Sequence, residues 1–278
     1  MQYSNGYIIR FTLILTLVLG SLLAIVAMVL KDRQDRNKDL DAKKQILGAV
    51  TQIDGETDVL ALYKEHIEAI VVDINGDEQK TEGDPSKINI GKEYKKSPDT
   101  RLYPVFKYKE EGKVSAYIIP TYGNGLWDKI WGFVAVSDDL NSLAGISLDH
   151  KGETPGLGSR IAEPSVMARY KGKKIYDDKG KLVSINMLKG EHGGGDKSIK
   201  FFADKDNEVD GLSGATMTTK GVNKMLKNYF THYENYFNSI KKERAKQKEE
   251  VLKEQQKTVE LDSMMNQTDS LVVETEEK

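Results

Sequence analysis

The sequence predicts an α+β fold, in which an N-terminal transmembrane helix precedes a domain with a largely antiparallel sheet flanked by helices. Three features predict it. Residues 11–30 form an uncharged apolar run, residues 102–136 contain β-rich segments joined by short turns, and a strongly periodic helical pattern begins at Val222. The chain is expected to divide into a membrane anchor at 1–36, a folded domain at 37–240, and a charged helical extension with a loose tail at 241–278.

The composition argues against several classes of site. Among 278 residues, 41 Lys and Arg nearly balance 43 Asp and Glu, so no basic surplus indicates a nucleic-acid partner. Cysteine is absent, which excludes thiol catalysis, disulfides, iron–sulfur ligation and cysteine zinc sites. The histidines show no metal-ligand spacing: His66, His150, His192 and His232. We therefore expect neither a metal site nor a catalytic residue of these kinds.

The apolar run from Phe11 to Leu30 is long enough to cross a membrane, because roughly twenty helical residues span about 30 Å. A cleavable signal peptide is the alternative. The apolar run, however, continues through Met28-Val29-Leu30 beyond the small residues Ala24 and Ala27, and no small-x-small site followed by polar residues ends it. We therefore predict an uncleaved, single-pass anchor.

The charges around this span give only a small orientation signal. The flanking residues are Arg10 before the span, and Lys31, Asp32, Arg33, Asp35 and Arg36 after it. Lysine and arginine count alone would place the C-terminal side in the cytoplasm. The excess is small and mixed with aspartates, so it does not decide the orientation.

Helices, turns and strands are expected next. An amphipathic helix is predicted over residues 38–53, ended by Asp54-Gly55, and Thr57 is predicted to cap a second helix. Strands are predicted at 69–72, 102–108, 114–119 and 130–136, with weaker ones at 145–148 and 182–187. Residues 77–100 suggest a surface excursion, residues 161–170 a helix, and the turns at 111–113 and 179–181 suit hairpins.

The last helix of the domain is preceded by the most informative stretch, Asp210–Thr219. The apolar residues after it recur at helical spacing: Met225, Leu226, Tyr229, Phe230, Tyr233, Phe237 and Ile240. A helix start has unpaired N–H groups and the positive end of the helix dipole, which suits a phosphate. Glycines allow close backbone approach, and a threonine can cap the helix or be esterified. An ordinary capped helix is the alternative interpretation.

Within this stretch, Ser213-Gly214-Ala215-Thr216 after Asp210-Gly211 resembles the flavinylation motif of the FMN-binding domain family. In that family, FMN is joined through its phosphate to the last threonine of the motif. The resemblance implies attachment at Thr216, with Ser213, Gly214 and Ala215 shaping the loop. Asp210 would orient the loop or bind the metal of the attaching enzyme; alternatively, it is a turn residue bonded to its own backbone.

A charged residue one turn into the same helix, Lys220, would balance the phosphate charge under this interpretation. An exposed lysine without a role is the alternative. The glycine-rich stretch Gly190–Asp196 lacks the lysine and Ser/Thr of a P-loop, so we predict a flexible turn there.

A second motif, Glu153-Thr154-Pro155-Gly156-Leu157-Gly158, follows a predicted strand. Proline and glycine make a rigid turn with close backbone approach, and a plain loop is the alternative. The stretch also matches the Glu-Thr-Pro-Gly-Leu-Gly signature of the FMN-binding family. The resemblance implies that Glu153, Thr154, Leu157 and Gly158 hold the flavin.

A third motif, Gly123-Asn124-Gly125-Leu126-Trp127, lies in a turn between two strands. A hairpin with a buried tryptophan is the alternative to the family interpretation, in which Leu126 and Trp127 lie against or near the flavin ring, whose flat face suits an apolar surface. The pattern is similar to that of C subunits of sodium-translocating NADH:quinone oxidoreductases. The related G subunits of Rnf electron-transport complexes usually differ at this stretch.

The resemblance implies a membrane-anchored flavoprotein subunit that relays electrons from NADH toward quinone, coupled in the whole complex to sodium export. It implies the other subunits of a six-subunit membrane complex as partners, and a flavin transferase that attaches FMN. It also places the domain on the periplasmic side of the inner membrane, contrary to the charge count. The chain alone is not expected to oxidise NADH. Three alternatives stay open: an Rnf-type G subunit, an extracellular flavin reductase, and a cofactor-free anchored module.

Overall fold

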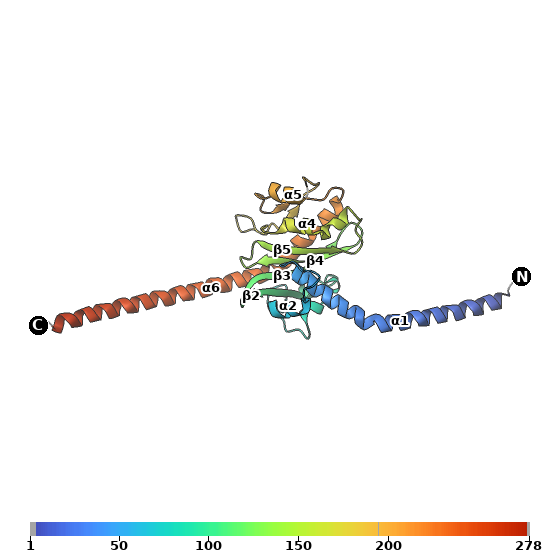
Figure 1. The fold of residues 1–278 in the computed structure, drawn as a ribbon. Coiled ribbons are helices and arrows are strands. Elements are labelled where there is room, and N and C mark those ends of the chain that lie inside the picture. Colours follow the sequence, from blue (N-terminus) through green and yellow to red (C-terminus); the bar gives the residue numbers. More distant parts are fainter. Residues whose placement is uncertain (1–3, 194, 277–278) are drawn as a thin grey trace.

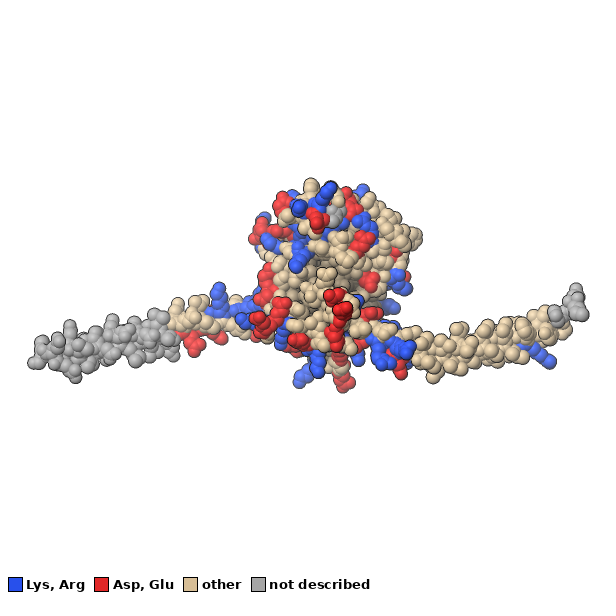
Figure 2. All heavy atoms as spheres, in the orientation of Figure 1, with Lys and Arg blue, Asp and Glu red and all other residues tan. Residues whose placement is uncertain are grey.

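Two long helices leave a folded domain in different directions (Figure 1). The computed structural model describes the backbone of residues 4–193 and 195–276, and the side chains of this part outside residues 195 and 257–276. Helix α1 (Asn5–Gly48) enters the domain from the N-terminus, and α6 (Thr216–Glu276) leaves it toward the C-terminus. Figure 2 shows that the arm formed by α1 is almost bare of charge, in contrast to the domain.

The domain is built on a five-stranded sheet in which neighbours in sequence are neighbours in space and every pairing is antiparallel. This confirms the predicted antiparallel α+β fold. Its strands are β1 (Ile67–Val72), β2 (Tyr103–Glu110), β3 (Lys113–Asn124), β4 (Lys129–Ser137) and β5 (Leu143–His150). The predicted hairpin turn between β2 and β3 is formed by Glu111 and Gly112, both at positive φ, which matches the twist of the two strands.

Each face of the sheet is covered by helices, because successive side chains of a strand point to opposite faces. On β3, Tyr117 and Ile119 belong to the core cluster that includes α6, whereas Ala116 and Ile118 belong to the cluster formed with the end of α1 and with α2 (Val59–His66). The sheet is therefore buried on both faces.

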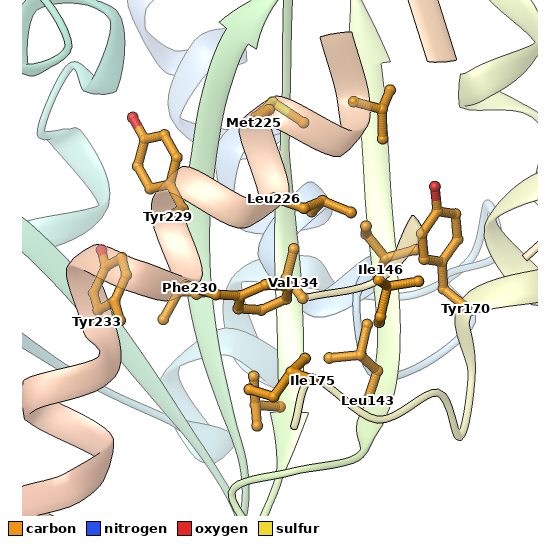
Figure 3. Packing of buried hydrophobic residues seen from close by; sticks show 14 of the residues in the cluster. Val134, Leu143, Ile146, Tyr170, Ile175, Met225, Leu226, Tyr229, Phe230 and Tyr233 are labelled. Carbon is orange, nitrogen blue, oxygen red and sulfur yellow. The ribbon is translucent and has the colours of Figure 1, made fainter. Parts of the chain in front are cut away.

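Helix α6 packs with the apolar stripe that the sequence predicts. Leu226 and Phe230 project from α6 toward Val134 (Figure 3), and Met225 and Tyr229 belong to the same buried cluster. One turn further, the buried Tyr233 hydroxyl donates a hydrogen bond to the Pro104 carbonyl oxygen at 2.8 Å. This packing holds the start of α6 firmly at one end of the sheet.

The remaining elements are short and lie in the connections. They are η1 (Pro85–Lys87), α3 (Ile90–Glu93), η2 (Pro98–Thr100), η3 (Gly158–Ala162), α4 (Pro164–Met167), η4 (Ala168–Tyr170), β6 (Asn186–Met187), α5 (Gly195–Phe201) and β7 (Glu208–Val209). Strands β6 and β7 form a separate parallel pair.

Two predictions at the N-terminal side were wrong. The helix expected over 38–53 is the end of α1, which continues from the apolar run without a break because no glycine or proline interrupts it there, and it ends at Gly48 and not at Asp54-Gly55. Asp58, not Thr57, caps α2: its Oδ1 accepts from the amides of Leu60 and Ala61, each at 3.1 Å, whereas the Thr57 hydroxyl bonds to Asp54.

Three other elements differ from expectation. The single helix predicted over 161–170 is split into η3, α4 and η4, because Pro164 disfavours helical backbone at the residue before it. The strand predicted over 182–187 is reduced to β6. Helix α6 extends to Glu276, beyond the start of the expected loose tail, since no glycine or proline follows Gly221 within it and each added residue gains a hydrogen bond.

Helix α1 is consistent with the predicted membrane anchor. It is long and apolar enough to cross a membrane, and none of its most apolar stretch is buried against the domain. Its large apolar side chains between Phe11 and Leu30 are exposed by 40% or more.

Candidate functional site

The three motifs meet at one end of the sheet. The turn between β3 and β4 carries the motif at 123–127, the turn after β5 carries the one at 153–158, and the loop into α6 carries the one at 213–216. These segments are far apart in the sequence, and the hydrogen bonds of one side chain connect them in space.

That side chain is Glu153, which is only 4% exposed. Its Oε1 accepts a hydrogen bond from the Trp127 amide at 3.0 Å, and its Oε2 accepts one from the Thr218 hydroxyl at 2.5 Å. Burial raises the pKa of Glu153, but the bonds from Thr218 and from amides of residues 126–128 outweigh it, so the pKa lies below its ordinary value. Glu153 is therefore an ionised carboxylate that ties the three motifs together.

Two glycines make room for this carboxylate. A Cβ on Gly158 would lie 2.5 Å from the Thr218 hydroxyl oxygen and 2.6 Å from Glu153 Oε2. A Cβ on Gly125 would lie 2.8 Å from Glu153 Cδ. All three distances are too short for a larger residue, so Gly158 and Gly125 are required by the position of Glu153.

An exposed apolar surface surrounds the buried carboxylate. Trp127 is 71% exposed, and its indole Nε1 donates to the Thr154 hydroxyl at 3.0 Å, which fixes the direction of the ring. Leu126, Leu157 and Met217 are also exposed. The alternative of a hairpin with a buried tryptophan is therefore wrong, and the site exposes several large apolar side chains near the start of α6.

The structure distinguishes the hydroxyls at the start of α6. Thr218 and Thr219 are buried, and their hydroxyls contact Glu153 and the Met187 sulfur. Thr216 is the first residue of α6 and is partly exposed, and Ser213 lies exposed in the loop. Gly214, at φ +73°, is placed so that a Cβ would lie 2.8 Å from Leu157 Cδ2.

Two other predicted residues lie near this helix start. Ala215 is buried beneath the loop, and its carbonyl oxygen accepts the Thr219 amide at 2.9 Å, which closes the first turn of α6. Lys220 is exposed on the helix surface, and its predicted role in balancing phosphate charge stays a prediction.

Asp210 is fully buried and does not bond to its own turn. Its carboxylate accepts the His192 amide at 3.0 and 2.9 Å and lies 2.9 Å from His192 Nδ1. Asp210 therefore anchors the loop before α6 to the glycine-rich stretch at 190–196. The segment predicted to be a flexible turn is therefore held by hydrogen bonds between His192 and Asp210.

Sequence reasoning missed a network of charged residues beside this loop. Glu191 accepts two hydrogen bonds from Arg160 and one from Arg169, all at 2.8 Å. Arg169 is buried, and its Nη1 donates to the carbonyl oxygens of Asp210 at 3.2 Å and Gly211 at 2.7 Å. A lone glutamate in a glycine-rich stretch carries no sequence signal for such pairing.

We predict that this network makes the domain sensitive to acid. The hydrogen bonds from Arg160 lower the pKa of Glu191, burial opposes this, and Arg169 lowers it further, to about 2 from 4.5. A carboxylate with a lowered pKa stabilises the fold above its unfolded pKa, and this contribution is lost as pH falls through 4.5 toward 2. In Glu191→Gln, urea unfolding midpoints should fall less steeply over this range than in wild type; parallel curves would refute the assignment.

The approach of α6 to the β3–β4 turn predicts an unusual effect at Gly221. Alanine normally stabilises a helix by about 1 kcal/mol over glycine. At Gly221 a Cβ would press on the Asn124 carbonyl group and lie 3.3 Å from Gly125 Cα. We therefore expect Gly221→Ala to lower the free energy of unfolding by about 1–3 kcal/mol. Urea unfolding measures this, with Lys224→Ala on the exposed side as control, and a stabilised Gly221→Ala variant would contradict the packing.

Comparisons with known proteins show the family of the chain. The FMN-binding domain family matches residues 125–231, a range that contains the motifs at 153–158 and 213–216 and begins within the one at 123–127. Over 232 residues the chain is 34% identical to the C subunit of the Na(+)-translocating NADH-quinone reductase of Haemophilus ducreyi, covering 78% of this chain and 86% of the relative. Its counterpart in Neisseria meningitidis serogroup B is 32% identical over 241 residues, with the same coverage.

Solved structures show the same fold. The crystal structure of the counterpart from Parabacteroides distasonis is 34% identical, with a TM-score of 0.64 over 75% of this chain and 96% of that chain. NqrC of Shewanella oneidensis is 26% identical, with a TM-score of 0.59 over 74% and 99%. The chain therefore belongs to the FMN-binding family of C subunits of the Na(+)-translocating NADH-quinone reductase, and it is a subunit of that enzyme.

Proposed function

We propose that this chain carries FMN as a phosphoester of Thr216 and relays electrons from NADH toward quinone within the complex. The observation that supports the proposal is the convergence of three motifs on Glu153, which joins the turn of the exposed Trp127 to the first turn of α6, where the partly exposed Thr216 lies. A bound flavin supplies the redox chemistry, and the protein supplies its placement.

The residues present fit this cofactor in two ways. Leu126, Trp127 and Leu157 expose apolar side chains that suit the flat flavin ring. The first turn of α6 presents amides without intrahelical acceptors, and the dipole of the helix favours the negative charge of a phosphodiester there. Thr154 would act through Trp127, since its hydroxyl holds the indole.

Glu153 would have a structural role and would take no part in electron transfer. Its ionised carboxylate holds the Trp127 amide and the Thr218 hydroxyl, and so keeps the apolar surface and the start of α6 in register. A relay of electrons requires no general acid or base from the chain, and an ester requires only the Thr216 hydroxyl at the helix start.

Fluorescence in a denaturing gel tests this function. The full chain is produced with and without its flavin transferase, and the denatured bands are compared under ultraviolet light. We expect a yellow fluorescent band only when the transferase is present. A band without fluorescence in the presence of an active transferase would refute the proposal of a covalent flavin.

For its location, we propose that the domain lies on the periplasmic side of the inner membrane, with the N-terminus in the cytoplasm. The support is the apolar arm of α1 and the resemblance to a family that receives its flavin outside this membrane. The other subunits would supply the NADH site, the iron–sulfur centre and the sodium path, because the span at 11–30 carries no charge for ion transport.

Single-cysteine labelling checks the orientation cleanly, because the chain has no cysteine of its own. We expect Ser97→Cys, exposed in the domain, to react with a membrane-impermeant maleimide in cells with a permeabilised outer membrane. Gly6→Cys, where a side chain meets no neighbour, should react only after the inner membrane is broken. The reverse pattern would place the domain in the cytoplasm.

A further inference from the structure

Three charged side chains connect the turn after β5 to the loop before α6, and none of them is among the proposed flavin contacts. Arg160, Glu191 and Arg169 form this set, which we call the charged bridge. Glu191 lies in its middle, with Arg160 on both carboxylate oxygens and Arg169 on Oε1. The exposed fractions of the side chains are 23% for Arg160, 15% for Glu191 and 2% for Arg169.

One end of the bridge is fixed to the second motif. Arg160 lies in η3, and its amide donates to the Leu157 carbonyl oxygen at 3.2 Å. Leu157 and Gly158 are the last two residues of that motif. A shift of the Arg160 backbone would therefore move the turn that carries Leu157.

The other end of the bridge is fixed to the loop before α6, which leads to Thr216. The buried Arg169 guanidinium holds the carbonyl oxygens of Asp210 and Gly211. A Cβ on Gly211 would lie 2.8 Å from the carbonyl carbon of Leu188, so the backbone at residues 188–190 packs directly on the loop. The loop is thus held between Arg169 and the segment that carries Glu191.

The geometry indicates that this bridge fixes the relative position of two segments, in addition to its contribution to stability at neutral pH. The planar guanidinium groups bind carboxylate and carbonyl oxygens in fixed directions. A buried ion pair contributes little net stability compared with well-packed apolar residues, but it fixes the groups it joins. Here it joins the turn that exposes Leu157 to the loop that ends at Thr216.

We propose that Glu191 is a positioning residue, which acts through Arg160 and Arg169 to set the Thr216 loop relative to the turn at 153–158 and so controls how readily Thr216 accepts flavin. This inference rests on the proposed attachment at Thr216, in which the threonine oxygen would bond to the FMN phosphorus of FAD while the pyrophosphate P–O bond breaks, AMP leaves and the hydroxyl proton is released. A small displacement of a reacting group is enough for a large loss of rate, so the effect should appear in the rate of attachment.

The test compares the initial rates of covalent flavin incorporation in the purified full chain, with its flavin transferase and FAD, at a temperature where circular dichroism shows each variant folded. We expect Glu191→Gln to lower the rate about tenfold or more. Glu191→Asp, which keeps the charge, should recover part of it. The matched control is Glu68→Gln, since Glu68 also binds two cations, Lys107 and Lys109, but lies in β1.

A second readout needs no flavin. Hydrogen–deuterium exchange of the flavin-free chain should show faster uptake at residues 209–216 in Glu191→Gln than in wild type or Glu68→Gln. If Glu191→Gln does not fold, Arg160→Gln, at the partly exposed end of the bridge, is measured instead, with the same two expectations. Normal attachment and normal exchange in the folded variant would overturn the inference, as would equal losses in Glu68→Gln.

Thr216→Ala is included in the same series, so that the two proposals can fail separately. Flavin retained in Thr216→Ala would refute the attachment site. Attachment lost in Thr216→Ala but unchanged in Glu191→Gln would refute only the positioning role.

Discussion

Replacing Thr216 with alanine is expected to abolish covalent flavin entirely, whereas Ser213→Ala should leave the band fluorescent in a denaturing gel. The structure separates the candidates for the attachment hydroxyl. Thr218 and Thr219 are buried, with their hydroxyls on Glu153 and Met187, so neither can be esterified without breaking the packing of α6. Thr216 and Ser213 are the accessible hydroxyls of this segment.

The choice between these two follows from the helix. Thr216 begins α6, where unpaired amides and the helix dipole favour the added negative charge, whereas Ser213 lies before the helix. Both variants should unfold at nearly the wild-type urea concentration, because neither residue is buried. Covalent flavin in folded Thr216→Ala, or loss of covalent flavin in Ser213→Ala alone, would show that Thr216 is not the attachment residue.

Replacing Glu153 with alanine should damage both stability and flavin attachment. It leaves the Trp127 amide and the buried Thr218 hydroxyl without their acceptor, and each unsatisfied group costs about 1–3 kcal/mol. It also removes the link between the β3–β4 turn and α6. We expect a lower urea midpoint and at least about a tenfold lower rate of flavin incorporation.

Two variants give this prediction its controls. Glu153→Gln keeps an acceptor for the Trp127 amide, so its losses should be smaller. Glu65→Ala removes an exposed carboxylate from α2, away from the site, and should change neither quantity. If Glu153→Ala is as stable and as readily flavinylated as Glu65→Ala, the joining role of Glu153 is wrong.

The sequence predicted those parts of the fold that depend on local pattern. The stripe from Met225 to Phe237 has helical spacing, and it packs on the sheet as expected because burial requires one face of α6 to be apolar. The Glu111-Gly112 turn is likewise local, because a hairpin needs residues that accept positive φ. The break at Pro164 was also a local signal, since the residue before a proline disfavours helical backbone, but the prediction of one helix over 161–170 did not include it.

The site was predicted as a set of motifs but not as a geometry. The sequence pointed to Glu153 and to the loop before Thr216, yet the bond from Glu153 to Thr218 joins residues 65 positions apart, and no local pattern reveals it. The contact of Arg169 with Gly211 spans 42 positions, and that of Arg160 with Glu191 spans 31. Such pairings arise only when the packed sheet brings the segments together.

Intact-mass analysis of the protein purified from its native membranes tests the central claim most directly. The account predicts a single species heavier than the polypeptide by one esterified FMN, with the added mass on the fragment that contains Thr216. A species with the mass of the unmodified polypeptide would contradict it.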